Sequence, residues 1–257
     1  MVPEFAEFTG ATAQRSRFAA QAPSFPPPLS ESAPSQHISF SGVSIWYAWH
    51  KRPEPHSLNN KTLTRSDFAE YGEIRDATQR RRSLATRALL RRALSEAAGG
   101  IVKPLDWEFE RGAHGKPTLS SPVKGLNFSC SHTHSVSVIA VSRSKPIGID
   151  VEAAIPAHED SGWIADFFAA GEKRALQRLP FEARAAACAR LWSLKEATVK
   201  MLGTGLALDV SKLEFDIEAD RLASSQVPEI NASGMRLATW SIPDNAHSLS
   251  VALTVKI

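Results

Sequence analysis

Three acidic side chains and two lysines, spread over two short segments, have the residue types of a site for a metal ion and a phosphate. Asp150 and Glu152 are separated by one residue at the end of an apolar segment. Glu196 follows Lys195 directly, and Lys200 lies four residues further on. Carboxylate oxygens are the ligands that Mg²⁺ prefers, and ammonium groups neutralise phosphate or pyrophosphate. The pattern therefore predicts a phosphoryl-transfer type of site.

The expected secondary structure brings these groups together. Side chains alternate along a strand, so Asp150 and Glu152 point to the same side if their segment is extended. Lys195 and Lys200 lie on a predicted helix, about 140° apart around its axis, and can flank an anion. Two simpler readings stay open: a strand end with two solvated acids, and an amphipathic helix with ordinary surface charges.

An arginine-rich segment precedes these motifs: seven arginines lie between positions 75 and 92. On a continuous helix Arg80, Arg87 and Arg91 fall on one narrow stripe. This stripe is either a solvated basic face or an anion site at the edge of a cleft. Nucleic-acid binding through the arginines would require aromatic or polar base readers beside them. The helix contains no aromatic residue, so we do not expect a nucleic-acid partner.

Two further segments contain groups that bind anions. His132 and His134 share one face of a strand, but two histidines do not make a zinc site, and neither cysteine has C-x-x-C spacing. A phosphate-binding turn of Ser131 and His132 is an equally good interpretation, since hydroxyl and imidazole groups both donate to phosphate. The turn at 112–117 displays Lys116 and lacks the ending of a Walker A loop.

Composition is that of a globular protein of 257 residues with one large core or two smaller ones. The sequence contains no apolar run long enough to cross a membrane and no secretory signal pattern in residues 1–36. Two cysteines are too few for a disulfide framework, which favours a reducing, cytoplasmic location. A net charge of +3 is too small to indicate nucleic acid by itself.

Helix and strand patterns predict an α+β fold with antiparallel sheets. Residues 1–36 hold six of the sixteen prolines and are expected to form a disordered extension. Each remaining half contains one long helix and about three strands, and residues 135–142 and 147–151 are expected to pair as a hairpin. The predicted helices cover residues 66–74 with Ser66 as N-cap, 80–98, 163–170, 172–179 and 183–202. The predicted strands cover residues 38–47, 106–110, 126–129, 135–142, 147–151, 212–217, 237–242 and 249–255.

Taken in order from about residue 37 to the C-terminus, these segments resemble the Sfp-type 4′-phosphopantetheinyl transferases. The resemblance is carried by the arginine-rich helix, the G-x-x-G-K-P turn at 112–117, the S-H-T triplet at 131–133, the acidic motif at 148–152, the F-F-x-x-x-E segment at 167–172, the W-S-L-K-E motif with Lys200, and G-T-G-L at 203–206. The family pattern N-x-S-H-[ST] is two residues longer here after Asn127, so either Asn127 is displaced or a β-bulge restores the register.

The resemblance implies a pseudo-dimer of two similar α+β halves, residues 37–146 and 147–257, with the active site in the cleft between them. It implies an enzyme that transfers the phosphopantetheine arm of coenzyme A to a serine of an acyl or peptidyl carrier protein and releases 3′,5′-ADP. Mg²⁺, or Mn²⁺ in its place, would be required, and the protein would be a monomer. A non-catalytic module that binds coenzyme A or a carrier, and a Mg²⁺-dependent phosphohydrolase, are the alternatives.

The resemblance also assigns roles to individual residues. The metal ligands would be Asp150, Glu152 and Glu196. Glu196, or water held by the metal, would remove the proton from the carrier serine, while Lys195 and Lys200 would neutralise the pyrophosphate and the leaving phosphate. The coenzyme A contacts would come from Arg87, Ser131 and His132 at the 3′-phosphate and from Lys116 and Pro117 at the nucleotide end. A basic rim for an acidic carrier would come from Arg75, Arg81 and Arg82.

Overall fold

The computed structural model describes residues 36–40, 42–50, 61–112, 114–120, 123, 125–154, 166–219, 221–228, 230–231, 234–243 and 248–256. The predicted N-terminal extension lies outside these residues, apart from residue 36. Across the described ranges, none of the helices combines the length and the apolar character needed to cross a membrane.

Two antiparallel sheets form the centre of the molecule. One sheet has the spatial order β1 (Gln36–Phe40), β2 (Val43–Trp49), β6 (Val136–Arg143) and β5 (Leu126–His132). The other has the order β10 (Met235–Pro243), β11 (Ser248–Lys256) and β7 (Ile147–Ala153). Two small hairpins accompany them: β3 (Phe109–Arg111) with β4 (Pro117–Leu119), and β8 (Leu213–Asp216) with β9 (Arg221–Ser225). The helices are α1 (Arg65–Gly72), α2 (Ala77–Ala97), α4 (Ala170–Arg178) and α5 (Phe181–Leu202).

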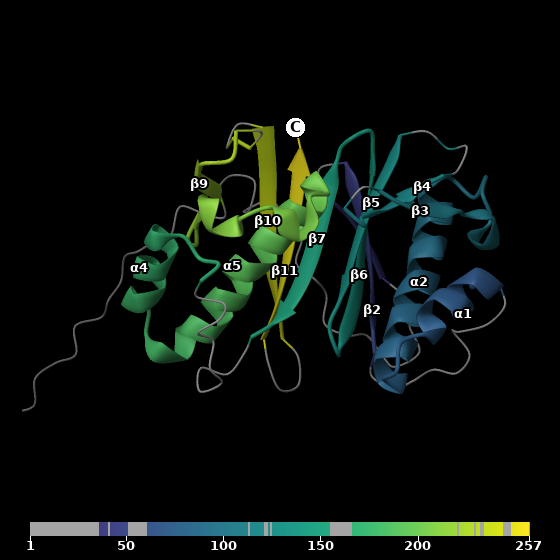
Figure 1. The fold of residues 1–257 in the computed structure, drawn as a ribbon, viewed down its shortest axis with the longest axis horizontal. Coiled ribbons are helices and arrows are strands. Elements are labelled where there is room, and N and C mark those ends of the chain that lie inside the picture. Colours follow the sequence, from purple (N-terminus) through teal and green to yellow (C-terminus); the bar gives the residue numbers. More distant parts are fainter. Residues whose placement is uncertain are drawn as a thin grey trace, which may run out of the picture.

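The sheets lie between the two long helices, α2 on one side and α5 on the other (Figure 1). Alternation along each strand explains this layering. Val43, Ile45 and Tyr47 of β2 join a core cluster that also contains Ile147 and Ile149 of β7, so this cluster fills the space between the sheets. The intervening Trp46 packs with Leu89 and Leu94 of α2 on the other face. The predicted α+β class is confirmed.

The sheets meet along one edge of each. Strands β5 and β7 lie side by side, and the backbone N–H of Ile149 donates to the Ser129 hydroxyl over 3.0 Å. A side-chain hydroxyl therefore satisfies an amide that faces away from the strand pairing of its own sheet. This seam between the sheets brings the end of β5 next to the acidic motif of β7.

The predicted hairpin of residues 135–142 and 147–151 is wrong. Strand β7 pairs with β11 rather than with β6, so the chain passes from one sheet to the other at residues 144–146. The physical reason is that the apolar faces of β6 and β7 both enter the cluster between the sheets. Two strands that face one core from opposite sides cannot also be neighbours in one sheet.

Several predicted element boundaries are also corrected. Helix α1 is capped by Thr64 in a capping box with Asp67, not by Ser66. Of the predicted helix at 163–170, residues 163–165 lie outside the described residues, and 166–169 are not helical. Strand β5 extends to His132 and pairs with β6 in continuous register, so of the two alternatives for Asn127 the β-bulge is not formed. Strand β9 was not predicted from the sequence.

Helix α5 approaches β7 most closely at Gly148. A Cβ at this position would lie 1.8 Å from the carbonyl oxygen of Ala197 and 2.5 Å from the backbone nitrogen of Met201. Both contacts are with backbone, which cannot rotate away as a side chain can. Glycine at 148 is therefore what allows the helix with Glu196 and Lys200 to lie directly on the strand with Asp150 and Glu152.

We predict that Gly148→Ala lowers the free energy of unfolding by at least about 3 kcal/mol, as overpacking between backbone segments is costly. Urea denaturation followed by circular dichroism measures this. Gly72→Ala is the matched control, because a Cβ there has nothing within 4 Å, and alanine is the better helix former. Equal stability of the two variants would contradict the close-packing argument.

Candidate active site

Strand β7 and helix α5 bring the three predicted acidic residues close enough to influence one another. Burial and the neighbouring Asp150 raise the pKa of Glu152 to about 8, and Glu196 adds to the rise. Burial and Asp150 also raise the pKa of Glu196. Mutual repulsion of half-buried carboxylates disfavours their charged forms, and a bound cation would offset this repulsion.

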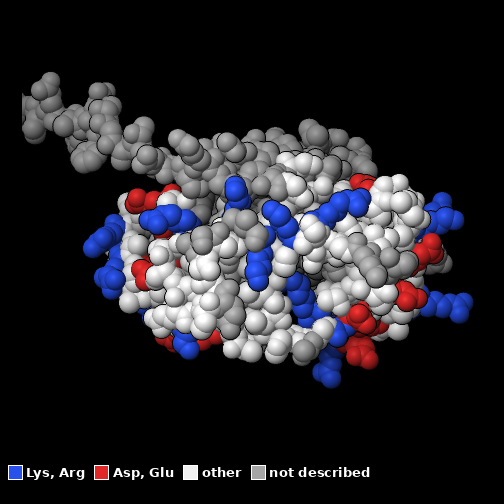
Figure 2. Space-filling view, turned by 90° about the horizontal axis from the view of Figure 1, so that it is seen from above, with Lys and Arg blue, Asp and Glu red and all other residues white. Residues whose placement is uncertain are grey.

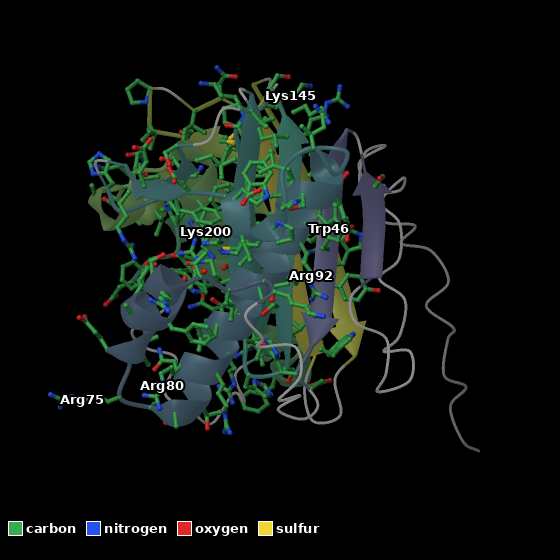
Figure 3. The ribbon with its side chains drawn as sticks, turned by 90° about the vertical axis from the view of Figure 1, so that its right-hand side faces the viewer. Trp46, Arg75, Arg80, Arg92, Lys145 and Lys200 are labelled. Carbon is green, nitrogen blue, oxygen red and sulfur yellow. The ribbon has the colours of Figure 1, made fainter. Side chains whose placement is uncertain are left out.

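Asp150 is the most enclosed of the three, with 2% of its surface exposed. Its Oδ1 atom accepts hydrogen bonds from Lys200 Nζ at 2.5 Å and from the Ser131 hydroxyl at 2.8 Å. Lys200 Nζ also donates to the Ser131 oxygen over 3.0 Å. Burial lowers the pKa of Lys200, but Asp150 outweighs burial, and the pKa is raised overall. Lys200 lies among packed side chains, while Arg75 lies at the periphery (Figure 3).

The other oxygen of Asp150, Oδ2, is buried and has no hydrogen-bond partner within the described parts of the chain. A buried, unpaired carboxylate oxygen beside two further carboxylates is a donor set that suits Mg²⁺. Among the described residues, no three Asp, Glu, His or Cys side chains are already gathered at ligand distance. The residue types and the unpaired oxygen fit the ion.

A cavity of about 620 Å³ opens beside these residues. One wall is the turn before β4, with Lys116 and Pro117, and the opposite wall is α5, with Glu196 and Lys200. Lys116 Nζ donates to the Met201 carbonyl over 3.3 Å, and burial lowers the pKa of this lysine. Much of the remaining lining is aromatic or aliphatic: Phe128, Phe167, Trp192, Val199, Leu208 and Val210. A cavity of this size with an apolar lining and a few charged groups suits an organic phosphate ligand.

Lys195 does not lie in this cavity. It is 0% exposed, and its Nζ atom lies 2.9 Å from Glu172 Oε2. Nζ also donates to the carbonyls of Val210 and Leu213 at 2.8 and 2.5 Å. These three partners use all of its ammonium protons. The two predicted lysines therefore have different environments. Lys200 contacts the Asp150 carboxylate, whereas Lys195 is buried against Glu172.

Arg87 and Arg91 form neither a solvated basic face nor an open anion site. Arg91 donates to both oxygens of Asp67 at 2.8 and 3.1 Å. Arg87 lies 3.5 Å from Asp67 and 3.2 Å from Glu70, with its guanidinium 4.3 Å from the ring centre of Phe109. One nitrogen of Arg87, Nη1, is buried without a partner in the described structure. Both arginines hold α1 against α2 in an internal ion-pair network, while Arg80 of the same stripe donates to the Ile74 carbonyl.

Ser131 and His132, the two predicted phosphate-binding residues of β5, have different neighbours because consecutive side chains of a strand point to opposite faces. Ser131 faces Asp150 and Lys200, whereas His132, at the end of β5, lies near His50 and Arg82. His134 is exposed beyond the strand end, so His132 is the inward-facing histidine of the pair. Asn127 takes no part, since its amide donates to the Gly125 carbonyl.

His50 and Arg82 are the residues that sequence reasoning missed at this position. Burial, followed by the charges of His132 and Arg82, lowers the pKa of His50 to about 4. His50 Nε2 forms a hydrogen bond of 2.9 Å with the Ser137 hydroxyl, which bonds Thr86 at 2.6 Å. Three basic side chains, from β5, α2 and the residue after β2, thus gather at one place. The segments are far apart in sequence, so spacing gave no signal, although Arg82 already stood out as part of the arginine-rich segment.

We predict that Lys195→Met lowers the free energy of unfolding by about 3–5 kcal/mol, because Glu172 would remain as a buried, uncompensated carboxylate. Urea denaturation measures the loss. Lys212→Met is the matched control: its ion pair with Asp209 is exposed and 3.7 Å long, so the cost should stay below about 1 kcal/mol. A fully stable Lys195→Met protein that lacks enzymatic activity would contradict the structural role.

We also predict an acid-sensitive contribution from His50. Its pKa is about 4 in the folded chain and about 6.5 when unfolded, so the unfolded state binds more protons in between. The free energy of unfolding therefore falls as the pH falls from about 6.5 to about 4. In His50→Gln, which can still bond Ser137, the difference in Tm between pH 7 and pH 5 should shrink. The exposed His134→Gln is the control, and an unchanged difference in His50→Gln would refute this assignment.

Comparison with known proteins agrees with the geometry. The family model for the 4′-phosphopantetheinyl transferase superfamily matches residues 146–252. The 4′-phosphopantetheinyl transferase HetI of Nostoc sp. is 32% identical over 168 residues, which cover 64% of this chain and 70% of HetI. The 4′-phosphopantetheinyl transferase psf-1 of Bacillus pumilus is 30% identical over 171 residues, 66% of this chain and 70% of psf-1.

A human relative extends the comparison beyond bacterial proteins. The L-aminoadipate-semialdehyde dehydrogenase-phosphopantetheinyl transferase of Homo sapiens is 27% identical over 217 residues, which cover 75% of this chain and 67% of that protein. The range matched by the family model includes the acidic motif of β7 and the W-S-L-K-E segment of α5. The chain belongs to the 4′-phosphopantetheinyl transferase superfamily, a family of transferase enzymes.

Proposed function

We propose that this enzyme transfers the 4′-phosphopantetheine group of coenzyme A to the serine of an acyl or peptidyl carrier protein and releases 3′,5′-ADP, in a Mg²⁺-dependent reaction. The observation that carries the proposal is the contact of Lys200 with Asp150 beside Glu196, at the wall of a cavity between α5 and the turn before β4. The proposed halves are residues 37–146 and 147–257, and the boundary falls between β6 and β7, which belong to different sheets.

Asp150, Glu152 and Glu196 would hold Mg²⁺, and Mn²⁺ would suit the same oxygen ligands. When bound, the ion would neutralise charge on the pyrophosphate of coenzyme A. Glu196 is the proposed base for the carrier serine, since its raised pKa makes it a stronger proton acceptor than an exposed glutamate. Lys200 supplies positive charge to the leaving phosphate and holds Asp150 in place. Lys195 is omitted from the proposed catalytic set, because its protons are used in the core.

We assign the 3′-phosphate end of coenzyme A to the basic cluster of His132, His50 and Arg82, in place of the expected set of Arg87, Ser131 and His132. Burial, His132 and Arg82 disfavour the protonated form of His50, and a bound phosphate would offset that effect. Lys116 and Pro117 line the cavity and remain the proposed contacts to the nucleotide. Ser131 instead supports Asp150 through its hydroxyl.

A carrier protein that is acidic around its serine would be steered by a basic surface. Lysines and arginines gather across the middle of the face shown in Figure 2, and acidic residues lie toward its ends. Arg75 and Arg81 are the proposed rim residues on the side of α2. A monomer in the cytoplasm would suffice, since one chain supplies both walls of the cavity.

Intact-mass spectrometry of an apo acyl carrier protein incubated with the enzyme, coenzyme A and Mg²⁺ tests the proposal. We expect the carrier mass to increase by one phosphopantetheine and EDTA to abolish the increase. No increase with coenzyme A still bound would favour the binding-module alternative. No increase with coenzyme A hydrolysed would favour the phosphohydrolase.

We predict that Asp150→Asn and Glu196→Gln each slow carrier modification by at least about 100-fold, because each removes a charge at the reacting phosphate. The rate is read from the carrier mass over time, and circular dichroism confirms the fold. Asp216→Asn is the matched control, since Asp216 pairs with the exposed Arg221 and is not part of the cavity lining. Near-normal rates in either site variant would refute the metal-site assignment.

A further inference from the structure

Helix α5 contacts both carboxylates of β7, each with a different residue. Trp192, Glu196 and Lys200 are four residues apart, so they form one stripe along the helix. All three line the cavity. Lys200 binds Asp150, and the Trp192 side chain forms a hydrogen bond with the Glu152 carboxylate. Because indole nitrogen is a donor only, Trp192 donates and Glu152 accepts.

The indole ring is itself held by its surroundings. The ring of Phe167 lies 5.4 Å from it, centre to centre, at an angle of 53°. Trp192 also packs against the apolar cluster that includes Leu191 and Leu194 of the same helix. Packing on both sides restricts the rotation of the ring, so the direction of its N–H group is fixed.

A neutral donor at this position has a physical advantage. Glu152 is half-buried and is repelled by Asp150 and Glu196, so without a partner its side chain would turn toward solvent. A second lysine could hold it, but that ammonium would compete with a bound cation for the carboxylate. An indole N–H orients the carboxylate and leaves its negative charge available.

We propose that Trp192 is the positioning residue of Glu152: its N–H keeps this carboxylate turned toward Asp150 and Glu196 before a divalent cation binds. The inference rests on the proposed function, in which Glu152 is a metal ligand. It adds that the affinity for the ion depends on an aromatic side chain that does not itself contact the ion.

The test compares Mn²⁺ binding, measured by electron paramagnetic resonance in the presence of saturating coenzyme A, in wild type and Trp192→Phe. Phenylalanine keeps a ring against Phe167 and loses the N–H. We expect about 10-fold weaker Mn²⁺ binding, the lower end of the range for groups that orient metal ligands. Trp46→Phe is the matched control, because Trp46 Nε1 donates over 2.7 Å to Glu96, a carboxylate on the far side of the other sheet. Its Mn²⁺ affinity should equal that of wild type.

A double-mutant cycle with Glu152→Gln separates positioning from packing. If Trp192 acts through Glu152, Trp192→Phe should add less than a twofold loss of Mn²⁺ affinity in the Glu152→Gln background. Unchanged affinity in the single variant, or the same loss in both backgrounds, would overturn the inference. Absence of Mn²⁺ binding by wild type would instead overturn the proposed metal site. Circular dichroism and Tm report whether Trp192→Phe folds, and Trp192→His, which keeps a ring N–H, provides the rescue variant.

Discussion

The close approach of α5 to β7 is the contact on which the candidate site depends. Gly148 leaves no side chain between the strand and the backbone of Ala197, so the helix lies directly on the strand. At that separation Lys200 reaches Asp150, and Trp192 reaches Glu152, within hydrogen-bond distance. A wider separation would break both contacts together, because they are made by the same helix against the same strand. Backbone packing at one glycine thus sets the positions of the side chains that carry the chemistry.

Charge is divided unequally across the seam between the sheets. The half that contains β7 and α5 supplies three carboxylates, and the half that contains β2, β5 and α2 supplies His50, His132 and Arg82. Lys200 and Lys116 lie in the cavity wall. A ligand with a pyrophosphate and a separate phosphate matches this arrangement, because the first needs a cation beside the acids and the second finds basic side chains directly. Each group of like charges is unfavourable alone, which is typical of sites that bind a partner of opposite charge.

The sequence predicted the parts of the site that depend on local geometry. Asp150 and Glu152 share a face because the residues between and before them enter the core between the sheets. The sequence could not show that Lys195 and Lys200 have different environments, since both lie close to Glu196. Lys195 is buried because it pairs with Glu172, a residue of another helix. The ion pairs of Arg87 could not be predicted for the same reason, as its partners Asp67 and Glu70 lie on α1. The position of β7 in the second sheet depends on pairing with β11, about a hundred residues later in the chain.

The seam of β5 and β7 has a consequence for how this protein can change during evolution. Ser129 satisfies the backbone amide of Ile149, and Ser131 donates to the Asp150 carboxylate, so two serines of one strand complete two adjacent residues of the other. Loss of either serine hydroxyl would leave a buried polar group of β7 with one hydrogen bond fewer. Position 131 should therefore covary with position 150 among homologues, whereas position 129 should keep a hydroxyl whatever side chain stands at 149, because its partner there is the backbone.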